Sequence, residues 1–304
     1  MSALCILSQR PRRAITPPHR LWHGLLETLC LQPHPPRQNR AKRANQAPAV
    51  KDISVQFSFD HSTVDVNVAN TAALLAQVKQ RLAQRSGFAL ATINLDHLVK
   101  LARSPGFRAS YAAQDLIVAD GNPIVWLSRL ARRPVSLVPG SDMVLPLARA
   151  AAEAGVGVAL IGSTEPALEA AAEHLMRSIP GLIVSLKIAP AMGFDPEGDE
   201  AARILRDIAA RDIGLCFIAL GAPKQEAFAA RGRSLAPRTG FASVGAGLDF
   251  LAGSQNRAPK WVRAIAMEWL WRALSSPRRL IPRYAACAAI LPGQISAALR
   301  LRKE

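Results

Sequence analysis

The sequence predicts an α/β fold in which helices cover both faces of a mostly parallel β-sheet. From about residue 55 to residue 244, segments with apolar residues at helical spacing alternate with short apolar runs that are typical of buried strands. This alternation indicates βαβ units, whose crossover helices pack on the sheet. Half of the 304 residues are apolar, which is ample for a packed core.

The predicted elements follow one another in a regular order. Leu74, Leu75, Val78 and Leu82 recur at helical spacing, and residues 88–93 are typical of a buried strand. Each later helix is then followed by one strand. The expected helices span residues 143–154, 165–178, 199–211 and 224–235, and the strands that follow them span residues 156–161, 182–188, 215–220 and 241–244.

The positive charge of the chain is concentrated at its two ends. The net charge is +16, of which residues 1–50 contribute +7, residues 51–256 contribute +1 and residues 257–304 contribute +8. We therefore expect three parts. They are a basic, disordered extension over 1–50, an α/β core over 51–256 and a basic amphipathic appendage over 257–304.

The appendage interleaves aromatic and apolar residues with basic ones. Trp261, Trp269 and Leu270 lie near Lys260 and Arg263 in the sequence. Short amphipathic helices of this kind can lie in a membrane interface, where each basic residue near anionic lipid contributes about 1 kcal/mol. A helix docked on the core with a solvated basic face explains the pattern equally well. No run reaches the ~18 uninterrupted apolar residues of a spanning helix, so we expect no segment to cross a bilayer by itself.

The four cysteines are scattered along the chain, at Cys5, Cys30, Cys216 and Cys287. They form no C-x-x-C pair and have no histidines nearby at zinc spacing. This argues against a disulfide framework and against a structural metal, and it makes a reducing cytosol the expected compartment.

Polar and glycine residues follow the predicted strands at their carboxyl ends. Ligands of open α/β sheets bind at this edge, where helix N-termini present free N–H groups. The residues concerned are Thr92, Asn94, Asp120, Gly121, Gly162–Thr164, Gly221–Glu226 and Gly245–Asp249.

Several of these residues also have a purely structural interpretation. Gly162–Thr164 are most simply a strand-to-helix turn with a hydroxyl cap, and Asp120 could cap the helix that follows it. His97 is more simply a packing residue than a catalytic one. Lys224 and Gln225 could form a solvated first helical turn.

The usual phosphate-binding fingerprints are missing from the chain. No G-x-G-x-x-G follows a strand and no G-x-x-x-x-G-K-[ST] occurs, which disfavours hydride transfer and ATP hydrolysis. No D-x-D pair for a divalent metal follows a strand. The remaining amides, hydroxyls and isolated acids suit a nucleotide diphosphate without a metal.

Seven motifs, in order and at similar spacing from about residue 55 to residue 285, resemble those of the WecG/TagA/CpsF family, which are bacterial glycosyltransferases of family 26. The motifs are Thr92–Asn94, Ala119–Gly121, Pro139–Asp142, Gly221–Glu226, Gly245–Asp249, Arg257–Pro259 and Glu268–Arg272. The resemblance implies a Rossmann-like core and a C-terminal, membrane-associating helical appendage that completes the site.

The resemblance also implies an activity. It is an inverting, metal-independent transfer of a sugar from a UDP-sugar to a polyprenyl-diphosphate-linked sugar, without a cofactor, in surface polysaccharide synthesis. The enzyme would be cytoplasmic and peripheral on the inner face of the cytoplasmic membrane. N-acetylmannosamine, its uronic acid, glucose and glucuronic acid all remain open as the sugar, and so does a homo-oligomeric state.

The resemblance assigns roles to three groups of residues. Asp120 matches the proposed catalytic base, with Thr92 and Asn94 beside it in the pocket. The nucleotide-binding group is Gly221, Lys224, Gln225, Gly245 and Asp249. The group that holds the acceptor or donor diphosphate is Arg272, Arg279 and Arg283. One departure is Leu137, which stands where the family commonly has an arginine in R-V-T-G.

These roles are chemically coherent. An isolated carboxylate at a strand end can take the proton of an acceptor hydroxyl as that hydroxyl attacks C1 opposite the leaving UDP. Arginines and backbone amides can stabilise the leaving diphosphate. If the arginines belong to the appendage, we expect the site to be complete only at the membrane.

Two other classes of protein remain as alternatives. A nucleic-acid-binding protein could use both basic ends, although no recognised nucleic-acid motif occurs and the aromatic residues of the appendage suit lipid better. A Rossmann-type oxidoreductase or methyltransferase is disfavoured by the missing glycine fingerprint.

Overall fold

The structure is a computed structural model that describes residues 55–59, 62–255 and 277–303, together with the single positions 259, 262, 271 and 274. The predicted extension over residues 1–50 lies outside the described residues. The predicted division into three domains stays a prediction.

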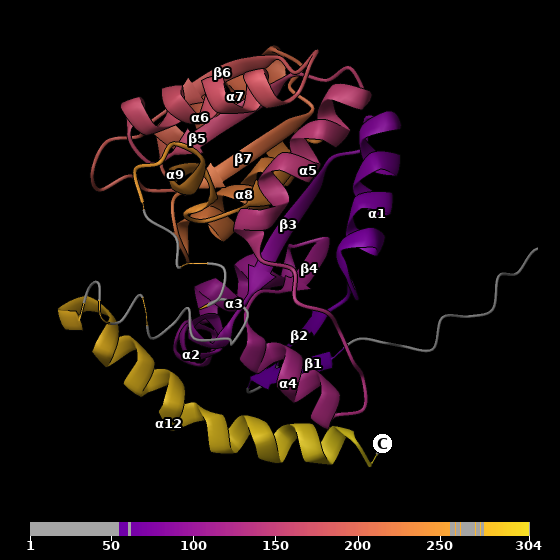
Figure 1. Ribbon diagram of the computed structural model, residues 1–304, viewed down its shortest axis with the longest axis vertical. Helices are drawn as coiled ribbons and strands as arrows, with labels where there is room; N and C mark the ends of the chain where they lie inside the picture. The colour runs from indigo at the N-terminus through magenta and orange to yellow at the C-terminus, as the bar shows by residue number, and fades with distance from the viewer. Residues whose placement is uncertain are drawn as a thin grey trace, which may run out of the picture. The chain divides into compact units, whose positions relative to one another are not determined.

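The core of the described chain is a six-stranded parallel sheet (Figure 1). Its strand order is β4-β3-β8-β7-β5-β6, and every neighbouring pair is parallel. A separate antiparallel hairpin of β1 (Val55–Phe59) and β2 (Ser62–Val66) precedes the sheet. The sheet strands are β3 (Phe88–Ile93), β4 (Leu116–Ala119), β5 (Val158–Gly162), β6 (Val184–Ile188), β7 (Leu215–Ala219) and β8 (Gly240–Ser243).

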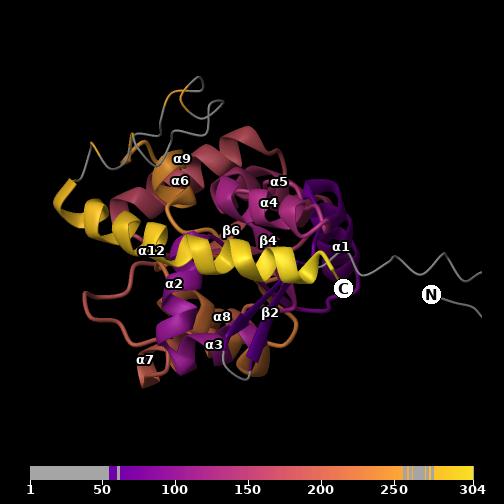
Figure 2. The same cartoon turned by 90° about the horizontal axis from the view of Figure 1, so that it is seen from below.

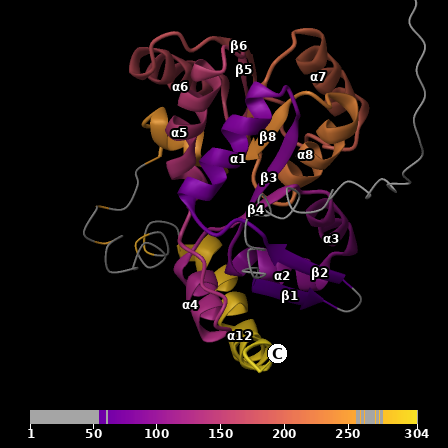
Figure 3. The same cartoon turned by 90° about the vertical axis from the view of Figure 1, so that its right-hand side faces the viewer.

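Helices cover both faces of the sheet because side chains alternate between its two sides. On β7, Phe217 belongs to the apolar cluster formed with α1 (Thr71–Ala83), α5 (Gly140–Glu153) and α6 (Glu165–Ser178). Its neighbour Ile218 belongs to the cluster formed with α7 (Asp199–Ala210) and α8 (Lys224–Leu235). Figure 3 shows α5 and α6 to one side of the strands and α7 and α8 to the other. The Rossmann-like fold class predicted from the sequence is confirmed.

A third apolar cluster lies around the β3 and β4 end of the sheet. It joins the hairpin to α2 (Leu95–Arg103), α3 (Pro105–Ala112) and α4 (Asn122–Leu130). Ala298 of the C-terminal helix also belongs to this third cluster, so the appendage shares a core with the sheet domain. Elsewhere in the chain, the short helix α9 (Gly247–Leu251) follows β8.

The C-terminal helix α12 (Pro277–Leu301) is 25 residues long and contains Pro282 and Pro292. The expectation of short helices is wrong for this part of the appendage. A proline removes one backbone hydrogen bond and bends a helix, but the bonds on either side of it can hold the helix together. Figure 1 shows α12 as one long, bent helix.

One side of α12 packs on α2 and α4 (Figure 2). Leu280, Cys287 and Ala298 are its buried residues, whereas most of the helix is exposed. By length and composition alone, residues Leu280–Leu301 are also sufficient to cross a membrane, with a mean hydropathy of 1.2. The expectation that no segment crosses a bilayer by itself stays a prediction, because length and composition alone do not show a crossing.

Candidate active site at the carboxyl edge of the sheet

Asp120, Thr92 and Asn94 lie together at the carboxyl ends of two neighbouring strands. Thr92 pairs with Val118 in the register of β3 and β4. The backbone N–H of Asp120 donates to the carbonyl oxygen of Ile93 at 2.8 Å, which continues the pairing beyond both strands. The structure thus brings the three predicted catalytic residues to one place. They come from two different sequence motifs, one at the end of β3 and the other at the end of β4.

Asp120 lies between β4 and α4 and is partly exposed. The N-cap of α4 is Gly121, whose φ is +122° and which has no side chain to cap the helix. Asp120 is therefore not the N-cap residue of α4. A backbone with this φ favours glycine, so Gly121 lets the chain turn sharply after Asp120.

Thr92 and Asn94 are held by local hydrogen bonds. Thr92 is buried, and its carbonyl oxygen accepts from the hydroxyl of Tyr111 at 2.8 Å. Asn94 is the N-cap of α2, and its Oδ1 accepts from the backbone N–H of His97 at 3.1 Å. The amide nitrogen Nδ2 of Asn94 takes no part in this cap. Asn94 therefore has a structural contact whatever it does in catalysis.

His97 packs in the core, as the sequence predicts. It is buried, and its Nδ1 lies 2.7 Å from the Tyr111 hydroxyl. Burial, followed by the nearby charge of Lys100, lowers the pKa of His97 to about 4. The ring is neutral at pH 7 and supports the backbone of Thr92 through Tyr111.

The N-terminus of α5 approaches the same edge closely. A Cβ at Gly140 would lie 3.0 Å from Cγ2 of Thr92 and 3.4 Å from the carbonyl oxygen of Ser243. A glycine at this position therefore lets α5 approach β3 and β8. Leu137, which replaces the expected arginine, is exposed beside buried Val138, whose N–H donates to the carbonyl of Ala119 at 2.8 Å.

Asp249 joins two loops of the carboxyl edge. Its Oδ1 accepts from the hydroxyl of Ser163, and its Oδ2 accepts from Nε2 of Gln255 at 2.8 Å. Thr164 caps α6, so the predicted hydroxyl cap in Gly162–Thr164 is confirmed. Ser163 follows β5 and Asp249 lies on α9, so the carboxylate braces the loops of two strands.

Gly245 lies between Asp249 and β8 in the chain, and its φ of +55° favours glycine. It forms the turn that leads from β8 toward α9. Gly245 is thus a turn residue, while its contact with a nucleotide stays a prediction.

The loop Gly221–Glu226 connects β7 to α8. Gly221 has a φ of +72°, and the Nζ of Lys224 donates to the carbonyl oxygen of Phe194 at 2.8 Å. Gln225 is buried, and its Nε2 donates to Oε1 of Glu226 at 2.8 Å. The interpretation of Lys224 and Gln225 as a solvated turn is wrong for Gln225, because this side of α8 faces the sheet.

Glu226 is the most deeply buried carboxyl group near this edge. It is 0% exposed, and burial raises its pKa from 4.5 to about 7. Among the described residues, its Oε2 and the Oε1 of Gln225 are buried without a hydrogen-bond partner. The sequence placed Glu226 in the Gly221–Glu226 motif but did not predict its burial, because burial of a first-turn residue depends on how α8 packs.

Arg283 of α12 reaches the start of α2. Its Nε lies 2.9 Å from Oδ1 of Asp96, whose side chain is 11% exposed. Asp96 follows the N-cap Asn94 by two residues, so Arg283 lies near the predicted catalytic group. Arg272 and the side chain of Arg279 lie outside the described part of the chain. Sequence reasoning missed Asp96, because its partner is almost two hundred positions away.

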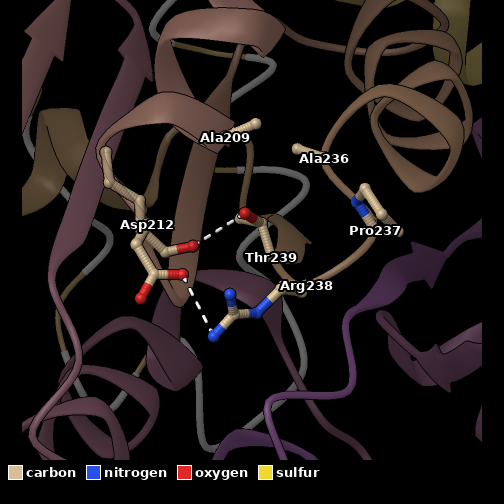
Figure 4. A pocket seen from close by; sticks show the side chains of 7 residues that line it. Ala209, Asp212, Ala236, Pro237, Arg238 and Thr239 are labelled. Carbon is tan, nitrogen blue, oxygen red and sulfur yellow. Dashed lines mark hydrogen bonds and ion pairs between the residues drawn. The ribbon is translucent and has the colours of Figure 1, made fainter.

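A small pocket at the opposite edge of the sheet contains none of the predicted site residues (Figure 4). It is formed before β7 and β8, where Arg238 pairs with Asp212 at 3.4 Å and the Thr239 hydroxyl donates to the carbonyl of Ile213 at 2.7 Å. Within the described residues, no three His, Cys, Asp or Glu side chains form a group that could hold a metal ion.

Comparison with known proteins agrees with this geometry. The model of the Glycosyl transferase WecG/TagA/CpsF family matches residues 60–304. A protein of Bacillus spizizenii is 28% identical over 210 residues, which cover 67% of this chain and 79% of the relative. A protein of Bacillus subtilis is 25% identical over 238 residues, which cover 76% of this chain and 90% of the relative. Both are named N-acetylglucosaminyldiphosphoundecaprenol N-acetyl-beta-D-mannosaminyltransferase.

The family match covers the whole sheet, α12 and all the motifs that the sequence analysis quoted. It decides the enzyme class against a nucleic-acid-binding protein and against an oxidoreductase or methyltransferase. This chain is a glycosyltransferase and belongs to the WecG/TagA/CpsF family.

Proposed function

We propose that this enzyme transfers N-acetylmannosamine from a UDP-linked donor to N-acetylglucosamine carried on undecaprenyl diphosphate, with inversion at the anomeric carbon. The names of the two relatives support the sugar, the acceptor and the β-linkage. The observation that carries the proposal is the position of Asp120. Its backbone is hydrogen-bonded to the end of β3, beside Thr92 and Asn94, at the carboxyl edge of the sheet.

Asp120 acts as the general base in this proposal. It takes the proton of the acceptor hydroxyl while the hydroxyl oxygen forms a bond to C1 of the donor sugar. The bond between C1 and the UDP oxygen breaks on the opposite face, so an α-linked donor gives a β-linked product. Thr92 and Asn94 flank the reacting groups from β3 and from the N-terminus of α2.

The leaving diphosphate gains negative charge as its bond to C1 breaks. In this proposal that charge is stabilised by Arg283 and by backbone amides of the loops that begin at Gly221 and Gly245, without a divalent cation. The positive φ of both glycines supports this role, because such turns can present consecutive N–H groups to an anion.

The exposed side of α12 and its neighbour α4 form the proposed membrane face. Trp126 of α4 is 54% exposed and Ile281 of α12 is 58% exposed, and Ile295 and Leu299 add further apolar surface. The sequence from Pro277 to Lys303 contains six basic residues and no acidic one. This combination favours the anionic inner face of the cytoplasmic membrane, with the helix lying in the interface rather than crossing it.

The test is a transfer assay with the full-length protein. It uses radiolabelled UDP-N-acetylmannosamine and a short-chain, diphosphate-linked N-acetylglucosamine acceptor, with the uronic acid, glucose and glucuronic acid donors in parallel. We expect transfer from the N-acetylmannosamine donor, a β-linkage by NMR, and an unchanged rate in EDTA. Transfer from none of these donors contradicts the proposed function, and a loss of activity in EDTA contradicts its metal-independent form.

A further inference from the structure

Asp96 is the centre of an ion cluster in which the reaction described above uses only Arg283. Its Oδ1 lies 2.9 Å from Nε of Arg283, and its Oδ2 lies 2.9 Å from Nζ of Lys100. The contact with Lys100 is an ion pair without hydrogen-bond geometry. The Asp96 side chain is 11% exposed, so these two cations replace much of its contact with water.

Lys100 extends the cluster to a second loop. Its Nζ donates to the carbonyl oxygen of Ala222 at 3.1 Å, within the Gly221–Glu226 loop. Three polar contacts thus connect α12 to the loop that follows β7, by way of one turn of α2. Figure 2 shows α12 crossing α2, which agrees with the packing of these helices.

The geometry leaves Arg283 suited to bind an anion. Asp96 contacts its Nε. The guanidinium group also has N–H donors on Nη1 and Nη2, and arginine can bind phosphate oxygens through two of its N–H groups at once. Two cations share one carboxylate here, so the cluster carries an excess positive charge. His97, next to Asp96, does not cancel or add to that charge at pH 7, because its pKa is about 4.

We propose that Asp96 is a positioning residue that fixes Arg283 for the diphosphate and couples the docking of α12 to the Gly221–Glu226 loop. The proposal rests on the proposed function for the identity of the diphosphate. The coupling itself rests on the contacts of Asp96 and Lys100 alone.

Hydrogen–deuterium exchange of the full-length protein tests the coupling without any substrate. Arg283→Gln removes the contact of α12, and we expect faster exchange in the amides of residues 221–226 as well as in α12. Asp96→Asn is expected to have the same effect on both segments. The matched control is Asp207→Asn, which breaks an exposed ion pair of the same i,i+4 kind with Arg211 on α7. Unchanged exchange in residues 221–226 in Arg283→Gln overturns the coupling. If Asp96→Asn does not fold, Arg283→Gln alone still provides the test, because Arg283 is partly exposed.

A double-mutant cycle tests the positioning of Arg283. We expect Asp96→Asn to lower kcat/KM for the lipid-linked acceptor about tenfold or more, the scale of a lost charge-assisted contact. In the Arg283→Gln background the same substitution is expected to have little further effect, because Asp96 acts through Arg283. Asp96→Glu is expected to recover part of the loss. If the losses in kcat/KM of Asp96→Asn and Arg283→Gln multiply in the double variant, the inference is overturned. An inactive wild type instead contradicts the proposed function.

Discussion

The N–H of Asp120 donates to the carbonyl oxygen of Ile93, so the end of β4 is fixed against the end of β3 at 2.8 Å. This bond places the proposed base one residue beyond the last paired position of the two strands, next to the N-cap Asn94. The backbone of the base is therefore set by the sheet.

For this reason Asp120→Asn is expected to keep nucleotide binding and to lower kcat by roughly 10²-fold or more, the scale of lost general-base catalysis. UDP binding by calorimetry and transfer rates measure the two effects separately. Asp199→Asn, at the start of α7, is the control, because it removes a carboxylate near the N-terminus of a different helix. A wild-type rate in Asp120→Asn excludes this residue as the base.

The buried carboxyl group of Glu226 gives a prediction on stability and pH. Its pKa in the folded protein is about 7, above the ordinary value of 4.5, so the folded state binds more protons than the unfolded state between these values. Stability contributed by Glu226 is therefore present at low pH and is lost as the pH rises toward 7 and beyond. The loss is on the order of 3 kcal/mol.

Glu226→Gln removes this dependence, and we expect the variant to gain stability over the wild type at pH 8 but not at pH 4. Denaturant unfolding at several pH values measures the difference. His97, with its lowered pKa, makes both proteins less stable as the pH falls below 6.5, and this contribution cancels in the comparison. A difference that does not vary with pH argues against a shifted pKa for Glu226.

Gly140 is expected to tolerate no side chain. The Cβ of Gly140→Ala would lie 3.0 Å from Thr92 and 3.4 Å from Ser243, so we expect a loss of about 1–2 kcal/mol in unfolding free energy together with reduced transfer. Gly293→Ala in α12 is the control, since nothing lies within 4 Å of its Cβ and alanine favours a helix. Equal stability of the two variants contradicts the close approach of α5.

Binding to lipid vesicles tests the proposed membrane face. Trp126→Ser and Ile281→Ser are each expected to weaken binding to anionic vesicles about fivefold, since each removes roughly 1 kcal/mol of apolar contact. The control is Ile183→Ser, which changes an equally exposed residue beside β6, at the far edge of the sheet. Similar losses in all three variants indicate general adhesion instead of a defined face.

Local patterns were sufficient to predict much of the sheet domain. The bounds of β3, α6 and α8 agree with the structure residue for residue, because apolar periodicity and caps such as Thr164 are local signals. The grouping of Thr92 and Asp120 was also predictable, since parallel strands place their carboxyl ends at one edge.

Other features depend on contacts between distant segments. The continuity of α12 through Pro282 was missed because helix packing can outweigh a local breaker. The burial of Gln225 and Glu226 follows from the side on which α8 meets the sheet. The pairing of Asp96 with Arg283 depends on the docking of the appendage, which periodicity does not encode.

The strand order has a consequence for the growing polypeptide. β3 is the earliest strand of the parallel sheet to be synthesised, yet one of its two neighbours is β8, the latest. A ribosome must therefore release nearly the entire catalytic domain before the centre of the sheet can close. Helix α12 emerges after that moment, so the sheet can close before the helix of the proposed membrane face has been synthesised.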